Sequence, residues 1–119
     1  MTFEGRRLPD LPHGEIHTEI QPGDYWKILT HDGSEPLRAT YASNLTGSCW
    51  FVVVPLVKAN SLAKGYGLGK LMKHTVREHE DGTISVRPND GSSNSILVTK
   101  GQDGPSWHGY IEHGVFRQC

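Results

Sequence analysis

The sequence predicts a single small, mainly-β domain of short antiparallel strands and hairpins, arranged as a sandwich or a partly open barrel, with little helix. Fourteen glycines and seven prolines are scattered over 119 residues, which indicates many turns. Short runs rich in valine, isoleucine and aromatic residues lie between these turn signals. No window shows a helical period; residues 59–64 could form a turn or two before the glycines that follow. We expect residues 1–22 to form an extended arm and residues 23–119 to form one domain.

Composition narrows the classes of function. Hydrophobic content is 35% and mean hydropathy is −0.48, values of a polar but folded chain. A formal net charge of −1 opposes strong attraction to nucleic acid or to an anionic membrane. The N-terminal segment lacks the apolar core of a signal peptide, and the run CWFVVVPLV is too short to cross a bilayer. We therefore expect a cytoplasmic protein, in which Cys49 and Cys119 are free thiols rather than a disulfide.

The elements follow in order along the chain. Residues 1–22 contain three prolines and predict an extended segment with weak strand content. A strand is expected at residues 25–30, ended by the turn signal HDG, and a second near residues 37–42. The apolar, valine-rich run at residues 49–54 predicts a central strand buried on both faces, with Pro55 at its end. A further short strand is expected at residues 95–99.

The segment HTVREHEDGTISV, residues 74–86, predicts a hairpin whose register can be decided. A two-residue DG turn would place Val76 on the face opposite to Ile84 and Val86. A three-residue loop at residues 80–82 pairs Val76 with Val86 and brings all three apolar residues to one face, with Gly82 in the left-handed conformation. We therefore predict the three-residue loop.

The closing segment SWHGYIEHGVF, residues 106–116, has a similar pattern, with glycine last in the sequence EHG. By analogy, a three-residue loop at residues 112–114 pairs Ile111 with Val115 and Tyr110 with Phe116. In that register His108 shares a face with Tyr110 and Phe116, whereas Trp107 and Ile111 share the other. His113 then lies exposed in the middle of the turn, so the two histidines are not expected to form one site.

The stretch KGYGLGK, residues 64–70, is rich in glycine but matches neither a dinucleotide fingerprint nor a phosphate loop. A flexible loop or hairpin tip is the expected structure. Five basic residues and no acidic one lie between residues 56 and 77, with a tyrosine among them. Such a loop can hold a phosphorylated ligand or an acidic surface, although a solvated loop carries the same residues. The candidate ligand-binding residues are Lys64, Tyr66, Lys70, Lys73, Arg77 and His108.

Metal binding and catalysis find less support. His13 and His17 have the ligand spacing of a helix, but the proline and glycine around His13 oppose a helix there, and no cysteine lies nearby. Neither Ser106 nor Cys49 belongs to a nucleophile signature. Glu78 shares the inward face of its hairpin. Over a buried acid–base group we favour an edge carboxylate that is either paired with a nearby basic residue or solvated at the end of the strand. We therefore predict no metal, no cofactor and no catalytic residue.

The motifs H-x-V, DGT-I-x-V, SI-x-V and WHGY-x-x-x-GV, within residues 74–119, resemble a small domain family of unknown function. Its members occur largely in actinobacteria and their phages. Other members of this group carry cysteine-rich or proline-rich segments upstream that this sequence lacks. The resemblance implies a protein of a mobile element and assigns no catalytic residue.

Three functions follow as hypotheses. The first is a non-enzymatic, phage-encoded accessory protein that binds a host or phage protein through its β surface in the host cytoplasm. The second is a binder of a nucleotide or another phosphorylated small molecule, such as a sponge for defence signals. The third is a virion or assembly component. Neither a membrane nor nucleic acid is expected as a partner, and an enzyme is the last alternative.

Overall fold

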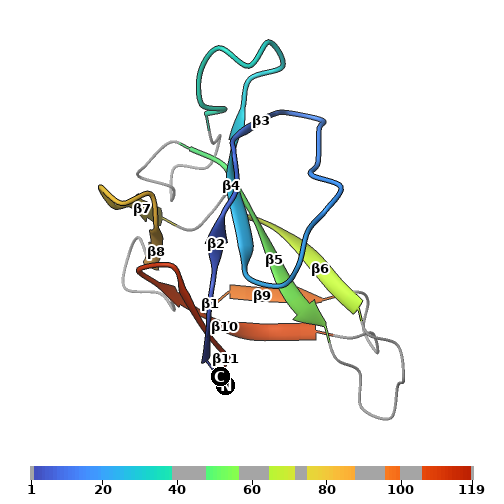
Figure 1. The fold of residues 1–119 in the computed structure, drawn as a ribbon, viewed down its shortest axis with the longest axis vertical. Coiled ribbons are helices and arrows are strands. Elements are labelled where there is room, and N and C mark those ends of the chain that lie inside the picture. Colours follow the sequence, from blue (N-terminus) through green and yellow to red (C-terminus); the bar gives the residue numbers. More distant parts are fainter. Residues whose placement is uncertain are drawn as a thin grey trace.

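The structure, a computed structural model, describes residues 2–38, 48–56, 65–71, 75–87, 96–99 and 106–118. These residues form eleven strands and no helix, which confirms the mainly-β prediction (Figure 1). The candidate helical turn at residues 59–64 and Cys119 lie outside the described residues. In the described part, no helix is long and apolar enough to cross a membrane.

The strands form two larger sheets and one separate hairpin. The C-terminal sheet has the order β1 (Thr2–Glu4), β11 (Val115–Gln118), β10 (Ser106–Glu112) and β9 (Ile96–Thr99), all antiparallel. The central sheet has the order β2 (Arg6–Arg7), β4 (Asp24–Leu29), β5 (Trp50–Leu56) and β6 (Gly65–Leu71), with β3 (Leu11–Pro12) also paired to β4. The hairpin consists of β7 (Thr75–Glu78) and β8 (Ile84–Arg87).

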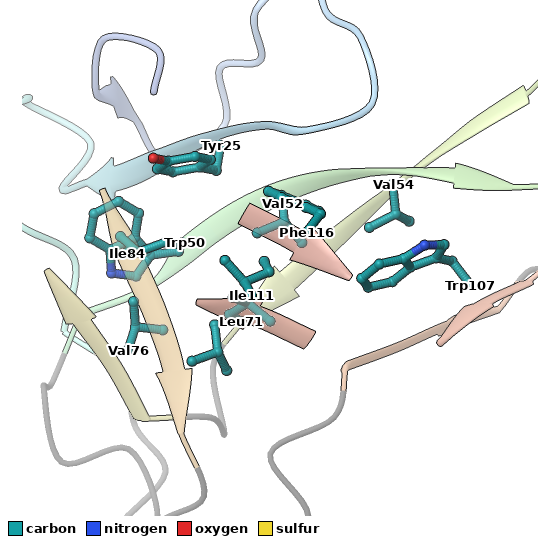
Figure 2. Close-up of a cluster of buried hydrophobic side chains, with 11 residues drawn as sticks. Tyr25, Trp50, Val52, Val54, Leu71, Val76, Ile84, Trp107, Ile111 and Phe116 are labelled. Carbon is teal, nitrogen blue, oxygen red and sulfur yellow. The ribbon is translucent and has the colours of Figure 1, made fainter. Parts of the chain in front are cut away.

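All three units contribute to one hydrophobic core (Figure 2). The central sheet supplies Tyr25, Trp50, Val52, Val54 and Leu71 to this core. Hairpin β7–β8 supplies Val76, Ile84 and Val86, and the C-terminal sheet supplies Trp107, Ile111 and Phe116. All of these side chains are at most 2% exposed, so alternate positions along each strand define one buried face.

Strand β5 is the central strand that the valine run predicts. Val52 and Val54 face the core, and Val53 and Cys49 are also buried, which confirms burial on both faces. The expected end at Pro55 was wrong, because β5 continues to Leu56 and Pro55 pairs with Tyr66. The Val53 carbonyl points toward β4 and accepts the Gly23 N–H. The backbone nitrogen of Pro55, two residues further along the strand, points to the same side. Since β4 begins at Asp24, the missing N–H of Pro55 faces a side on which no ladder continues.

Strand β6 replaces the loop predicted from the glycine-rich sequence. Its seven residues pair with β5 without interruption, from Leu71 opposite Trp50 to Gly65 opposite Leu56. The glycines alternate with larger residues, so they occupy one face of the strand, where Gly67 and Gly69 are buried opposite Val54 and Val52. Here period-two alternation, rather than glycine content, determines the structure.

The N-terminal arm contains three short strands, which pair with both larger sheets. Strand β1 pairs with β11, whereas β2 and β3 run parallel to β4. The chain changes sheet at Gly5, whose N–H donates to the Gly114 carbonyl at 2.7 Å. A Cβ atom at Gly5 would lie 2.7 Å from the carbonyl oxygens of Gly114 and Gly23 and from the Phe116 ring, so only glycine fits.

Hairpin β7–β8 has the predicted three-residue loop. Val76 pairs with Val86 and Glu78 with Ile84, and Gly82 has a φ of 86°. The Asp81 carboxylate accepts hydrogen bonds from the hydroxyl and the N–H of Thr83, which lower its pKa. The register prediction is therefore confirmed, together with the burial of the apolar face.

The closing hairpin, in contrast, has a two-residue turn, and the predicted register was wrong. Ile111 pairs with Phe116, and Glu112 pairs with Val115. His113 and Gly114 form the turn with φ values of 47° and 77°, the left-handed pair that a tight hairpin needs. This register places Phe116 beside Ile111 on the core face, which the longer loop would not allow. His113 is exposed, as expected, and the strand predicted at residues 95–99 is present as β9.

The predicted strand near residues 37–42 is described only in part. Leu37 accepts a hydrogen bond from the Cys49 N–H, and Arg38 forms an isolated bridge with Ser48. The remaining residues of this prediction lie outside the described part of the chain. Cys49 is a buried free thiol, and burial raises its pKa.

A polar cluster joins the arm, β4 and β7 over the Trp50 ring. The Glu78 carboxylate contacts Lys27 Nζ at 2.7 Å and Arg7 Nη1 at 3.0 Å, and Arg7 also reaches Asp10 at 2.8 Å. The Arg7 guanidinium lies 4.7 Å from the centroid of Trp50. Burial disfavours the charged form of Glu78, but the hydrogen bonds from Lys27 and Arg7 outweigh this effect and lower its pKa. The ion-paired interpretation of Glu78 is confirmed.

Replacement of Glu78 by glutamine tests this cluster. Since Glu78 is 38% exposed, solvent screening limits the expected loss of unfolding free energy to about 1 kcal/mol at pH 7. The pKa of Glu78 in the folded protein is below its ordinary value of 4.5, so this stability is present above that pH. Urea denaturation should show the difference between wild type and Glu78→Gln shrinking as pH falls through the folded pKa. A difference in unfolding free energy that grows as the pH falls would contradict a stabilising role for the ionised Glu78.

Gly109→Ala should destabilise the C-terminal sheet. A Cβ atom there would collide with the Arg117 carbonyl and lie 2.5 Å from the Trp107 ring, which covers this position. Overpacking of this kind costs about 1–3 kcal/mol, with the backbone carbonyl favouring the upper end. Thermal unfolding measures the effect, and the exposed His108→Ala change beside it serves as the control. Equal melting temperatures for both variants would show that the strand yields freely at this point.

Candidate functional site

The predicted ligand-binding residues do not form one described site. Lys64 and Lys73 lie outside the described residues, and of Tyr66 only the backbone is described, in β6. Lys70 pairs with Phe51 on the face of β6 opposite to the core, and Arg77 is exposed on β7 opposite Ser85. His108 is exposed on the face of β10 opposite to Trp107.

Lys70 and His108 therefore lie on opposite sides of the molecule. The core is enclosed between the inner faces of the two sheets, and each residue is on the outer face of its own sheet. A single small ligand cannot contact both side chains. Lys70 and Arg77, which lie in the same basic stretch of the sequence, are on strands β6 and β7 of different sheets.

Lys70 instead lies beside two histidines from the arm and from the turn after β4. Its Nζ is 3.4 Å from His13 Nε2, and His13 Nδ1 is 3.2 Å from His31 Nε2. The ammonium group also lies 5.9 Å from the Phe51 ring centroid. This cluster is exposed, and its nitrogens satisfy one another as a short hydrogen-bonded chain.

A second pair of histidines holds two hairpins together. The rings of His79 and His113 stack at 3.9 Å with an angle of 12° between their planes. Beneath them, the buried Ser85 hydroxyl accepts the His113 N–H at 2.8 Å and lies 2.7 Å from His79 Nε2. The Gly114 N–H also donates to the Ile84 carbonyl at 2.8 Å. This arrangement fastens β7–β8 to the closing turn, which is a structural role.

The most continuous candidate surface is the outer face of the C-terminal sheet, which we define as Thr2, Glu4, His108, Tyr110, Glu112, Val115 and Arg117. Register places Thr2, Arg117 and Tyr110 in one row across three strands. A shallow cleft of about 150 Å³ lies among these residues.

Tyr110 and Arg117 form the centre of this outer face. The Arg117 guanidinium lies 5.0 Å from the Tyr110 ring centroid, a cation–π distance. On the core side of the same strands, the ring centroids of Trp107 and Phe116 lie 6.1 Å apart. This packing holds β10 and β11 in place beneath the outer face. The sequence prediction included His108 but missed Arg117. With the two-residue turn, the alternation of side chains along residues 115–118 places Phe116 on the core face and Arg117 on the outer face beside Tyr110.

The fold and this outer face define a small, mainly-β protein with a shallow aromatic and charged sheet surface. The chain matches no protein-family model, and comparison with curated proteins and with solved structures found no significant match. In the described part of the chain, no group of three or more histidine, cysteine, aspartate or glutamate residues is arranged to hold a metal ion.

Ser85→Ala tests the fastening of the two hairpins. The substitution removes the acceptor of the His113 N–H, and an unsatisfied polar group of this kind costs about 1–3 kcal/mol. Chemical denaturation should show that loss, and amide exchange at Gly114 should accelerate. Ser34→Ala is the matched control, because that exposed hydroxyl only bonds Asp32 and its loss should cost below about 0.5 kcal/mol. Equal effects of the two changes would contradict the role of Ser85.

Proposed function

We propose that the protein is a non-enzymatic accessory protein, encoded by a phage, that binds a host or phage protein through the outer face of the C-terminal sheet. The observation that supports this proposal is the Tyr110–Arg117 pair at the centre of that face, where Tyr110 is half-buried and Arg117 is exposed. Tyrosine and arginine are the residues that contribute most to binding energy in protein interfaces.

The shape of the outer face favours a macromolecule over a small ligand. Its cleft of about 150 Å³ is smaller than the roughly 300–1,000 Å³ of typical small-molecule pockets. The face is formed by three neighbouring strands, so it presents a broad area that an opposing protein surface can cover. Val115 and Tyr110 are half-buried within it, and charged residues surround them. An apolar centre with a polar rim is the usual anatomy of a protein interface.

The environments of two nucleophilic side chains, Ser85 and Cys49, favour protein binding over catalysis. Ser85 is buried and its hydroxyl accepts a backbone hydrogen bond, which directs it away from any substrate. Burial raises the pKa of the Cys49 thiol, which lowers its reactivity.

The alternative function, capture of a nucleotide or other phosphorylated molecule, rests on Lys70 among the described residues. Lys70 adjoins His13 and His31, but its predicted partners Arg77 and His108 lie on other surfaces. Protein binding therefore remains the proposal.

The Tyr110→Ala and Arg117→Ala double variant tests the proposed function. A tagged wild-type protein should capture a stoichiometric protein partner from host lysate, or from phage-infected cells. The double variant should lose that partner with at least a tenfold fall in affinity, because hot-spot truncation costs about 2 kcal/mol or more. Its melting temperature should stay within about 2 °C of wild type, as both side chains lie outside the core.

The control is Glu80→Ala, an exposed change on the other hairpin, which should retain the partner. Equal capture by the double variant and the control would contradict the assignment of this face. A wild-type protein that captures no partner from any host would contradict the proposed function itself.

A further inference from the structure

A second cleft lies away from the outer face, between β2 and the segment that leads into β4. It has a volume of about 650 Å³ and is lined by Arg6, Leu8 and residues 17–21. In Figure 1, the chain after β3 leaves the sheet in a wide loop and returns to the start of β4. The loop is held by His17, which stacks edge-on against Trp26 at 4.9 Å and lies 2.7 Å from the Pro9 carbonyl through Nε2.

A fixed guanidinium forms one wall of this cleft. Arg6 donates from Nε and Nη2 to the two carboxylate oxygens of Asp24, each at 2.9 Å. Asp24 is fully buried and also accepts the Gln21 N–H at 2.9 Å. Register pairs Arg6 directly with Asp24 across β2 and β4, so the backbone itself sets this geometry. Hydrogen bonding to Asp24 raises the pKa of Arg6, which stays charged.

The second edge of the guanidinium remains open. Arginine presents five N–H donors, and Asp24 occupies only the edge formed by Nε and Nη2. The Arg6 side chain is 52% exposed, and its Nη1 donates to none of the residues that the structure describes. The edge formed by Nη1 and Nη2 can therefore donate two parallel hydrogen bonds to a planar oxyanion. Since Asp24 already fixes the group, little side-chain entropy is lost on binding.

The rest of the lining selects among oxyanions. Asp24 offsets most of the charge of Arg6, and Glu19 adds a negative charge to the same cleft. A multiply charged phosphate is disfavoured by this balance, whereas a monoanion gains directed hydrogen bonds with little repulsion. Leu8 and Ile20 supply apolar surface for the body of the ligand.

We propose that this cleft, which we name the Arg6 cleft, binds a small monoanionic carboxylate with an apolar body through the open edge of Arg6. The site is distinct from the outer face and goes beyond the proposed protein binding. In this arrangement Arg6 has two functions: it pins the arm to β4, and it presents donors to the ligand.

Nitrogen-15 NMR of the full chain tests the proposal with three probes that share a phenyl ring. Benzoate should give saturable shifts of the Arg6 side-chain Nε signal and of the amides of residues 18–21. Phenyl phosphate should bind several-fold more weakly, and neutral benzamide should produce no saturable shift. Absence of saturation with benzoate, or an equal response to benzamide, would overturn the proposal. Tighter binding of phenyl phosphate than of benzoate would overturn the choice of a monoanionic carboxylate.

Two substitutions give opposite expected effects. Glu19→Gln should strengthen benzoate binding about twofold to threefold, as expected for loss of one nearby exposed like charge. Arg6→Lys should weaken it about tenfold or more, because lysine keeps the charge but lacks the bidentate edge. The exposed Arg38→Lys is the matched control and should change nothing.

Because Arg6→Lys leaves the buried Asp24 with a poorer partner and so lowers the stability of the fold, Leu8→Ser provides a second variant that leaves the ion pair intact. It should weaken benzoate binding severalfold by removing apolar surface. Unchanged affinity in both Glu19→Gln and Leu8→Ser would leave Arg6 with only its structural role and would refute the site. None of these changes involves Tyr110 or Arg117, so failure here is distinguishable from failure of the proposed protein binding.

Discussion

The backbone carbonyl and N–H of Gly114 join the closing turn to the N-terminal arm and to hairpin β7–β8. Its carbonyl accepts the Gly5 N–H at 2.7 Å, where the arm leaves the C-terminal sheet, and its N–H donates to the Ile84 carbonyl at 2.8 Å, in hairpin β7–β8. Both bonds need the tight turn in which His113 and Gly114 have positive φ values. The same turn sets the register that brings Ile111 and Phe116 to the core face. The closing hairpin, the arm and the second hairpin are therefore positioned by one short turn.

Both candidate surfaces depend on the arm that this turn anchors. Before Gly5, strand β1 extends the outer face with Thr2 and Glu4, through its pairing with β11. Immediately after Gly5, Arg6 enters the central sheet beside Asp24 and lines the Arg6 cleft. Because no Cβ fits at Gly5, the crossing has little freedom to shift. The proposed protein interface and the proposed Arg6 cleft thus share one structural support, although they lie on different parts of the surface.

Sequence reasoning succeeded where apolar residues alone determine a face. Val76, Ile84 and Val86 allow only one register, and the structure has it. In the closing segment, Tyr110 and Phe116 are both aromatic, so either register pairs an apolar residue with another, and the analogy to the first hairpin selected the wrong one. Strand β6 was missed because glycine usually marks turns, and its pairing with β5 is a long-range property. Two-residue parallel strands such as β2 and β3 leave no local pattern at all.

The site residues were harder to predict because charge in a sequence does not show which charges are already paired. Arg6, Arg7 and Lys27 are compensated in the fold by Asp24, Asp10 and Glu78. Arg117, in contrast, has no carboxylate within ion-pair distance among the residues that the structure describes. Among the described residues, its guanidinium lies against the Tyr110 ring, at 5.0 Å from the ring centroid. The formal net charge of −1 therefore gives no indication that Arg117, on the outer face, lies outside the ion pairs formed among the described residues.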